Sequence, residues 1–412
     1  MKLWLKYSAG IIFGAALALV APASLFAEGA AVAIAAELAL RLGYYVFIAL
    51  LAVNLPLSVF KLSGEKAFWR TILKSMAFFL ASTLVASAIG IGGALAAGPS
   101  RLPLGANAGL GMSAPIQGGT SPIFALLPKN LGALLSFSGD IGAPLLLFGL
   151  ALGLAMAHDP AAAVPFADVL DSLSRIFYTI NTFSSEILGL LLIPASAKAF
   201  RDISVPVSGG NYRILFLILG AGMFIIVFGL MPLFLYFING RKNPFPYLYA
   251  CLPAMLASLA SGNLRFSAGV LVRSVGEDLG LPRRRSSVSL VVGLAAGRVG
   301  TAFVSSATAV FILSSYSSLA VSPLNLLLLG LIVPLGCIST SWGIPGGPMG
   351  VLAFVFGIFG KGFESGYLAA VPLAIALSAF ASCLDLVWIG ICSPFCAGRR
   401  GSGALKPIRH FI

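Results

Sequence analysis

Apolar segments about as long as a membrane crossing recur from one end of this 412-residue chain to the other. Hydrophobic residues make up 59% of the chain and charged residues 9%, whereas soluble domains carry about 25% charged residues. A water-soluble fold of this length could not bury so much apolar surface. Since one crossing takes about 20 residues, the sequence predicts an all-α polytopic membrane protein without a large soluble domain.

The apolar runs and their breakers predict eight full spans. They cover approximately residues 4–26, 43–60, 71–97, 139–158, 168–197, 211–239, 286–316 and 365–394. The first run follows Lys2 and Lys6 and also has features of a cleaved signal peptide, for which Leu25-Phe26-Ala27 is the only cleavage cue. With its flanks this run is long enough to cross a membrane, which favours a retained first helix.

Two further segments are interrupted by small polar residues, glycine and proline. The first covers residues 245–277 and is broken at Ser261-Gly262-Asn263, and the second covers residues 323–360 and is broken between Ser339 and Pro348. Open backbone groups in hydrocarbon cost several kcal/mol each, so irregular chain at membrane depth lines a protein cavity or a solute. A pair of such segments indicates the binding site of a carrier. The alternative is that each is a kinked transmembrane helix.

Basic residues lie in the gaps between the apolar runs and predict the orientation. We take the N-terminus as cytoplasmic and let each broken segment leave the membrane on the side from which it enters. In this topology 16 of the 26 lysines and arginines are cytoplasmic and seven are outside. Counting either broken segment as a full crossing removes this asymmetry. The net charge of +13 therefore reflects membrane topology rather than nucleic-acid binding. We expect a cell inner or plasma membrane protein with both termini cytoplasmic.

Groups for catalysis or metal binding are scarce in this sequence. The two histidines, His158 and His410, lie at the ends of apolar runs. The five cysteines lie in apolar surroundings and lack the paired spacing of a zinc site. Because the spans hold no cluster of acids, bases or metal ligands, we expect no enzyme activity, no resident cofactor and no metal.

The order of six spans, a broken segment, a seventh span, a second broken segment and an eighth span resembles a known family. This family is the dicarboxylate/amino acid:cation symporters, the glutamate-transporter-like carriers. Ser261-Gly262-Asn263 looks like its serine-rich first hairpin tip, Gly300-Thr301 like the end of its seventh-helix motif Asn-Met-Asp-Gly-Thr, and Gly343-Ile344-Pro345-Gly346 like the Gly-Val-Pro-Gly of its second tip. The resemblance runs from Lys2 to about Cys396 and implies an inverted-repeat carrier fold with two re-entrant helical hairpins.

The resemblance also implies a homotrimer in which residues 1–244 mainly form a static scaffold. The moving transport domain would be residues 245–396, with hairpin 245–277, helix 286–316, hairpin 323–360 and helix 365–394, followed by a basic cytoplasmic tail at 397–412. The third span, 71–97, is expected to belong to the transport domain. This domain would carry a small carboxylated solute, amino-acid-like or a dicarboxylate, by elevator-type alternating access coupled to H+ or Na+.

Several positions depart from the family's pattern and mark a divergent member. Gly297-Arg298-Val299-Gly300-Thr301 stands where the family has Asn-Met-Asp-Gly-Thr, so a sodium site there lacks its carboxylate and amide. Trp388 stands where an arginine usually grips a side-chain carboxylate, and Cys392 and Cys396 replace polar and acidic positions. With Trp342, Trp388 favours a solute with an uncharged or aromatic side chain, or a small monocarboxylate, over glutamate or aspartate.

Arg298 and Asp385 are the deepest charged residues in the predicted spans, where a charge costs about 2.5–3.5 kcal/mol on insertion scales. In the resemblance, Asp385 aligns with the acidic residue that holds a substrate amino group. We hypothesise that Arg298 supplies the positive charge of a sodium ion, by pairing with Asp385 or by receiving a substrate carboxylate. The alternative is a structural buried pair. Arg175 and Arg265 lie near enough to the end of a span to reach the lipid headgroups.

The predicted solute site combines both hairpin tips, where half-helix N-termini attract anions, with the last two long helices. Its candidate residues are Ser261, Gly262, Asn263, Arg298, Thr301, Ser341, Trp342, Gly343, Asp385, Trp388 and Cys392. The candidate ion-coupling residues are Ser82, Thr83, Gly297 and Ser339. The hydroxyls of Ser82 and Thr83 bond equally well to their own helix, and Asp140 and Glu186 are interfacial or bond between helices. The competing function is a transport-inactive solute sensor or a structural membrane trimer.

Overall fold

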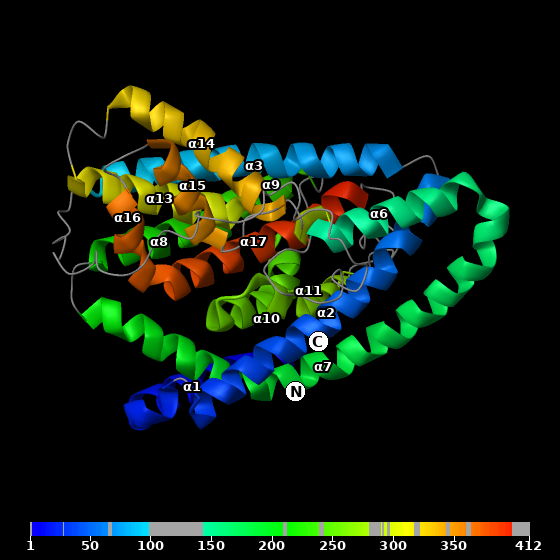
Figure 1. Cartoon of the computed structure of the whole chain (residues 1–412), viewed down its shortest axis with the longest axis horizontal. Helices are drawn as coiled ribbons and strands as arrows, with labels where there is room; N and C mark the ends of the chain where they lie inside the picture. Colours follow the sequence, from blue (N-terminus) through cyan, green and yellow to red (C-terminus); the bar gives the residue numbers. More distant parts are fainter. Residues whose placement is uncertain are drawn as a thin grey trace.

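Every regular element in the described part of the chain is a helix (Figure 1). The computed structural model describes residues 2–27, 29–64, 68–98, 143–208, 212–238, 243–279, 290, 292–294, 297–316, 322–342, 347–359 and 364–397. Eight helices within these ranges are long and apolar enough to cross a membrane. The prediction of an all-α polytopic membrane protein is therefore confirmed. Asp140 and the basic tail lie outside the described residues.

The first half of the chain forms long helices that differ in length from the predicted spans. They are α1 (Leu3–Val20), η1 (Ala23–Phe26), α2 (Ala31–Gly64), α3 (Phe68–Ala96), α6 (Ala143–His158), α7 (Pro160–Ser208), α8 (Arg213–Phe224), the π-helical η2 (Ile225–Leu230) and α9 (Met231–Ile238). The predicted spans 43–60 and 168–197 lie within longer helices, α2 with 34 residues and α7 with 49 residues. Figure 1 shows α7 as a long curved helix at the periphery, against which α1 and α2 pack.

The second half forms two pairs of helices alternating with two long, buried helices. The elements are α10 (Phe245–Ser261), α11 (Leu264–Glu277), α13 (Val299–Tyr316), α14 (Pro323–Trp342), α15 (Gly347–Phe359), α16 (Glu364–Ala370), η4 (Val371–Leu373) and α17 (Ala374–Ala397). Within each broken segment the two helices pack against each other, α10 on α11 and α14 on α15, as the arms of a hairpin do. The 20-residue α14 extends to Trp342, past the predicted start of the break at Ser339, and is long enough to cross a membrane by itself.

The break in the first hairpin follows from its local sequence. Gly262 ends α10 in the left-handed conformation, with φ +65°, and its N–H donates to the Ser258 carbonyl at 2.9 Å. This conformation is one that glycine adopts without a steric cost. Asn263 then caps α11, because its Oδ1 accepts from the N–H groups of Arg265 at 3.0 Å and Phe266 at 3.4 Å. The Gly-Asn pair therefore stops one helix and starts the next.

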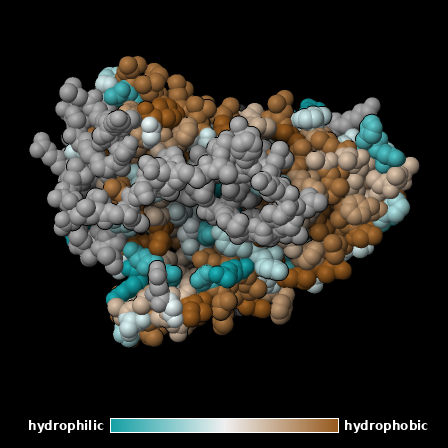
Figure 2. All heavy atoms as spheres, viewed as in Figure 1, coloured by the Kyte–Doolittle hydropathy of each residue, from teal (hydrophilic) through white to brown (hydrophobic). Residues whose placement is uncertain are grey.

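Helices α13 and α17 belong to the two most deeply buried of the eight candidate spans in the described ranges. Helix α3 packs along α13, and Figure 1 shows these helices running side by side. The outer helices carry exposed large apolar side chains, including Leu38 of α2, Trp69 of α3 and Leu190 of α7. Figure 2 shows broad apolar areas on this face. A surface of this kind suits contact with lipid chains rather than with water.

A polar bridge joins α11 to the long helices α7 and α1. Arg273 of α11 pairs with Glu186 of α7 at 2.9 Å, and Lys6 of α1 pairs with the same carboxylate. The fully buried Tyr7 hydroxyl donates to the Ser185 carbonyl at 2.7 Å. Glu186 was predicted to be interfacial or to bond between helices, and the bonding between helices is confirmed. The bridge fixes where the first hairpin lies against α7.

Replacing Tyr7 with phenylalanine should lower the free energy of unfolding by about 1 kcal/mol, because it removes one buried hydrogen bond and keeps the packed ring. The measurement is denaturant or thermal unfolding of the purified protein in detergent. Ser8→Ala is the matched control, since the Ser8 hydroxyl donates to the Trp4 carbonyl of its own helix and to no other described residue. Equal losses in the two variants would contradict a stabilising contact between α1 and α7.

Candidate functional site

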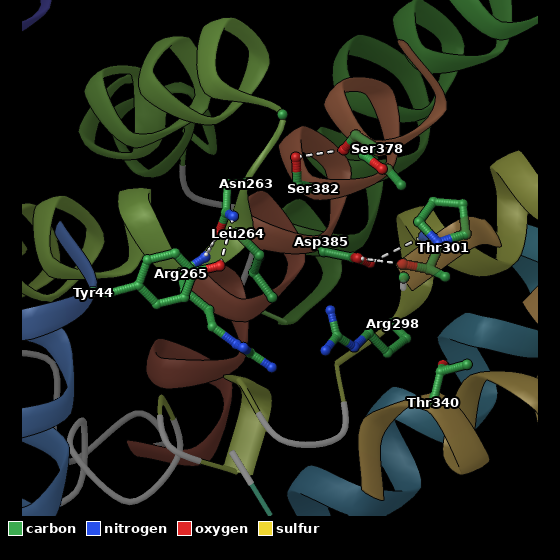
Figure 3. Close-up of a pocket in the computed structure, with 14 residues that line it drawn as sticks. Tyr44, Asn263, Leu264, Arg265, Arg298, Thr301, Thr340, Ser378, Ser382 and Asp385 are labelled. Carbon is green, nitrogen blue, oxygen red and sulfur yellow. Dashed lines mark hydrogen bonds between the residues drawn. The ribbon is translucent and has the colours of Figure 1, made fainter. Parts of the chain in front are cut away.

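A cavity of about 190 Å³ lies where the first hairpin tip meets α13 and α17 (Figure 3). Its walls come from α2, from the turn between α10 and α11, from the start of α13, from α14 and α15, and from α17. The lining residues are Tyr44, Gly262, Asn263, Leu264, Arg265, Arg298, Thr301, Thr340, Gly347, Pro348, Ser378, Ala381, Ser382 and Asp385. Five of the predicted site residues are brought together here: Gly262, Asn263, Arg298, Thr301 and Asp385.

Asp385 lies in the middle of α17, is 1% exposed and binds the first turn of α13. Its Oδ1 accepts from the N–H groups of Gly300 at 2.6 Å and Thr301 at 3.2 Å, and its Oδ2 accepts from the Thr301 hydroxyl at 2.7 Å. The N–H groups at the start of a helix lack partners within the helix and favour a nearby negative charge. Asp385 therefore caps α13 from a neighbouring helix.

Gly300 allows this contact, because a Cβ atom at this position would collide with α17. It would lie 2.3 Å from the Ala381 carbonyl oxygen, 2.5 Å from the Leu384 Cβ and 2.9 Å from the Asp385 nitrogen. Gly297 is similarly tight, with a hypothetical Cβ 2.8 Å from the Phe79 ring. Because neither position has room for a side chain, the two glycines set the spacing of the helices around the site. Gly297, a candidate ion-coupling residue, is not among the residues that line the cavity.

Arg298 lies in a short non-helical stretch just before α13 and lines the cavity. Figure 3 shows its guanidinium group directed into the cavity below Asp385. Its Nε is buried and has no hydrogen-bond partner among the described residues. Within the same residues Arg298 forms no ion pair with Asp385, whose oxygens bind Gly300 and Thr301 instead. The predicted pairing of the two charges is therefore not the arrangement found.

Arg265 is a second arginine of this cavity. It lies in the first turn of α11, and its guanidinium carbon is 5.9 Å from the centroid of the Tyr44 ring. Figure 3 shows its side chain extending from the hairpin tip toward Arg298. The turn at Gly262 and Asn263 brings the start of α11 to the cavity, which Arg265 lines. The prediction that Arg265 reaches the headgroups stays a prediction.

Tyr44 and the polar residues of α17 were missed by sequence reasoning. The Asn263 amide donates to the Tyr44 hydroxyl at 2.7 Å, a contact between residues 219 positions apart for which the sequence offers no local signal. Ser378 and Ser382 do have one, because they lie seven and three positions before Asp385 and so share its face of a helix. The Ser382 hydroxyl donates to the Ser378 carbonyl of its own helix at 2.6 Å.

Trp388 and Cys392 are not among the residues that line the cavity. The Trp388 ring packs instead against Phe78 of α3 and Phe234 of α9, with centroids 5.5 and 5.7 Å apart. Cys392 is fully buried. Trp388 therefore gives no support to a bulky apolar pocket. The side chains of Ser341 and Trp342 and the whole of Gly343 lie outside the described residues.

The remaining candidates bond locally. The Ser261 hydroxyl accepts from the Asn263 N–H at 3.3 Å within the hairpin turn. Thr83 donates to the Leu80 carbonyl at 2.8 Å and Ser339 to the Leu335 carbonyl at 3.0 Å, each within its own helix. Ser82 is buried in α3. None of the four lines the cavity, and their roles in solute binding or ion coupling stay predictions.

Known transporters match this chain over part of its length. The chain is 28% identical to excitatory amino acid transporter 4 of Mus musculus over 165 residues, which cover 40% of the chain and 29% of the relative. Excitatory amino acid transporter 2 of Homo sapiens is 28% identical over 169 residues, 40% of the chain and 28% of the relative. The serine/threonine transporter SstT of Streptococcus agalactiae serotype III (strain NEM316) is 25% identical over 187 residues, 44% of the chain and 41% of the relative.

These matches span less than half the length of the curated relatives. The model of the sodium:dicarboxylate symporter family, in contrast, matches residues 3–384. This match confirms the resemblance seen in the hairpin tips and in the end of the seventh-helix motif. The chain belongs to the sodium:dicarboxylate symporter family.

Proposed function

We propose that this protein is a secondary active transporter that moves a small carboxylated solute, amino-acid-like or a dicarboxylate, across the membrane. The observation that carries the proposal is the cavity between the first hairpin tip, α13 and α17, into which Arg298 projects. Its buried Nε has no hydrogen-bond partner in the described part of the chain. Guanidinium groups bind carboxylates through two parallel hydrogen bonds. The family is one of symporters rather than enzymes, and the relatives are named as transporters of amino acids.

We further propose an elevator-type movement of residues 245–396 against a scaffold made mainly of residues 1–244, within a homotrimer. Two packing relationships support this division. Helices α1 and α2 each pack on α7, whereas α3 packs along α13, as expected if α3 moves with the second half. Asn263 and Tyr44 meet where the two parts face each other at the cavity. The proposed location is the inner or plasma membrane, with both termini cytoplasmic.

Coupling to H+ or Na+ is part of the same proposal. Val299 stands where the family's seventh-helix motif has a carboxylate, so a sodium ion there would lack that ligand charge. Arg298 places a permanent positive charge next to this position. Ser82, Thr83, Gly297 and Ser339 remain the candidate coupling residues.

Replacing Arg298 with lysine should reduce uptake at least about tenfold, because an ammonium group keeps the charge but lacks the planar fork that grips a carboxylate. The measurement is uptake of radiolabelled succinate and aspartate by proteoliposomes, with size-exclusion chromatography to show that the variant assembles. Arg41→Lys is the matched control, since Arg41 is 73% exposed and pairs with Glu37 one turn away on α2. Normal uptake by the Arg298 variant would contradict the proposal that this guanidinium group binds the solute.

The second candidate function is a transport-inactive sensor or a structural trimer. The observation that favours it is the absence of the family's carboxylate at Val299. Counterflow distinguishes the two functions, because a sensor binds its solute without exchanging it across the membrane. Binding of a solute without exchange would favour the sensor over the transporter.

A further inference from the structure

The first turns of α3 carry cationic and apolar side chains on one exposed face, at the edge of the molecule (Figure 1). The other face is packed: Phe68 and Thr71 are buried, and Phe68 belongs to an apolar cluster that includes Leu62 of α2. Arg70 and Lys74 lie on the exposed face. Because the buried face holds the helix in place, the fold fixes where these two cations lie.

Arg70 and Lys74 form a pair of like charges. They are four residues apart in one helix, which places their Cβ atoms about 5–6 Å from each other. Neither has an ion pair or a hydrogen bond with another described residue, and the first turn of α3 holds no acidic residue. Lys61 of α2 and Arg175 of α7, in contrast, share the carboxylate of Asp171. The positive charge at the start of α3 is therefore not offset within the described part of the chain.

An apolar stripe borders the two cations on the same exposed face. Its residues follow one another at intervals of three or four, are each at least 42% exposed, and are Trp69, Leu73, Met76, Leu80 and Leu84. At about 1.5 Å per residue the stripe is about 22 Å long, more than the roughly 15 Å of hydrocarbon in one leaflet. The Trp69 ring lies edge-to-face on Phe68, with centroids 5.4 Å apart. Tryptophan is typical of the boundary between headgroups and acyl chains. The face therefore offers cations at its start and an apolar surface along its length.

We infer that this face of α3 binds one anionic phospholipid of the phosphatidylglycerol type. Arg70 and Lys74 contact the headgroup phosphate, and an acyl chain lies along the apolar stripe. Charge complementarity selects this occupant, because lysine and arginine near a membrane surface attract anionic headgroups, whereas a zwitterionic headgroup brings a cation of its own. The orientation expected from the basic residues places this end of α3 at the cytoplasmic surface. The inference goes beyond the proposed transport function and does not depend on it.

Quenching of Trp69 fluorescence by lipids with brominated acyl chains tests the site. The purified full-length protein is reconstituted into phosphatidylcholine vesicles that contain a rising fraction of brominated phosphatidylglycerol or of brominated phosphatidylcholine. The chain has 4 tryptophans, so the emission of Trp69 is taken as the difference between the wild-type protein and Trp69→Phe. At low ionic strength phosphatidylglycerol should bind beside Trp69 at least about tenfold more tightly than phosphatidylcholine, because both cations attract its headgroup. Equal quenching by the two lipids would overturn the inference.

Charge variants assign this preference to the two cations. Arg70→Gln and Lys74→Gln should each reduce it about threefold, and the double variant should reduce it to less than about twofold. The matched control is Arg41→Gln combined with Arg175→Gln, which removes the same charge from two exposed arginines that pair with acids of their own helices. A preference that survives in the double variant of α3, or that falls as far in the control, would contradict a site at Arg70 and Lys74.

Ionic strength gives a second test that needs no variant. Raising NaCl from about 0.05 to 0.5 M should lower the preference of the wild-type protein for phosphatidylglycerol several-fold, because salt screens exposed charges. A preference that does not change with salt would show that the cations do not cause it. Exchanging the two residues, with Arg70→Lys and Lys74→Arg together, keeps both charges and should keep the preference.

Glycerol phosphate separates a lipid site from a site for a soluble anion. At constant ionic strength it should leave the quenching by phosphatidylglycerol unchanged, because it has no acyl chain to lie on the stripe. Loss of the preference on adding glycerol phosphate would assign the cations to a soluble anion and overturn the lipid as the occupant. None of these measurements requires transport, so a failed lipid test leaves the proposed function standing, and an absence of counterflow leaves the lipid site standing.

Discussion

Replacing Gly300 with valine is expected to destroy the fold around the cavity and to leave little protein that can be purified intact. The new Cβ would lie 2.3 Å from the Ala381 carbonyl oxygen and 2.5 Å from the Leu384 Cβ, and both neighbours belong to the buried helix α17 rather than to a flexible surface chain. Helices α13 and α17 would have to separate, which would also break the bonds from Gly300 and Thr301 to Asp385. Overpacking costs about 1–3 kcal/mol and three lost hydrogen bonds about 1 kcal/mol each, so we expect a loss of about 4 kcal/mol or more.

The measurement for Gly300→Val is the yield and unfolding temperature of the detergent-purified protein. Gly92→Val in α3 is the matched control, because a Cβ at Gly92 meets no atom within 4 Å. Only the small effect of a β-branched residue on helix stability is expected there. Wild-type yield and unfolding temperature for Gly300→Val would show that α13 and α17 do not cross as closely as described.

Replacing Asp385 with alanine is expected to lower the free energy of unfolding by about 3 kcal/mol. The change leaves three buried donors, the N–H groups of Gly300 and Thr301 and the Thr301 hydroxyl, without their acceptor, at about 1 kcal/mol or more each. Asparagine keeps one acceptor oxygen and should cost less. The measurement is denaturant unfolding in detergent, with the exposed Asp168→Ala of α7 as a near-neutral control.

A double-mutant cycle with Thr301→Val separates the capping role of Asp385 from direct binding of a solute. If Asp385 acts through Thr301, the two substitutions together should cost less than the sum of their separate effects, by about 1 kcal/mol. Additive effects, or full stability of Asp385→Ala without solute, would contradict the capping role.

The main features of the fold were predictable because hydropathy and helix breakers act locally. The break predicted at Ser261-Gly262-Asn263 is found, with Gly262 ending α10 and Asn263 capping α11. Helix ends were less predictable where prolines lie inside helices. Helix α7 continues through Pro165 and Pro194, near which the sequence suggested ends, because packing on α1 and α2 supports the longer helix.

The candidate site was partly predictable, because some of its residues are unusual within an apolar segment. Arg298, Thr301 and Asp385 were found because charge and glycine inside an apolar run are unusual. Tyr44 and Arg265 were missed, since their place depends on how α2 and the first hairpin meet. Trp388 lies three positions after Asp385, yet the aromatic rings of α3 and α9 hold it away from the cavity. Sequence alone does not identify such neighbours.

Counterflow in proteoliposomes tests the central claim, that a carboxylated solute crosses the membrane through the cavity at Arg298. Vesicles holding purified protein are preloaded with unlabelled succinate, aspartate or serine and diluted into the same solute carrying a radiolabel. The account predicts transient accumulation of the label for at least one carboxylated solute, dependent on preloading and at least about tenfold slower in Arg298→Lys than in Arg41→Lys. Accumulation that is unchanged in Arg298→Lys, or its absence with all three solutes, would contradict it.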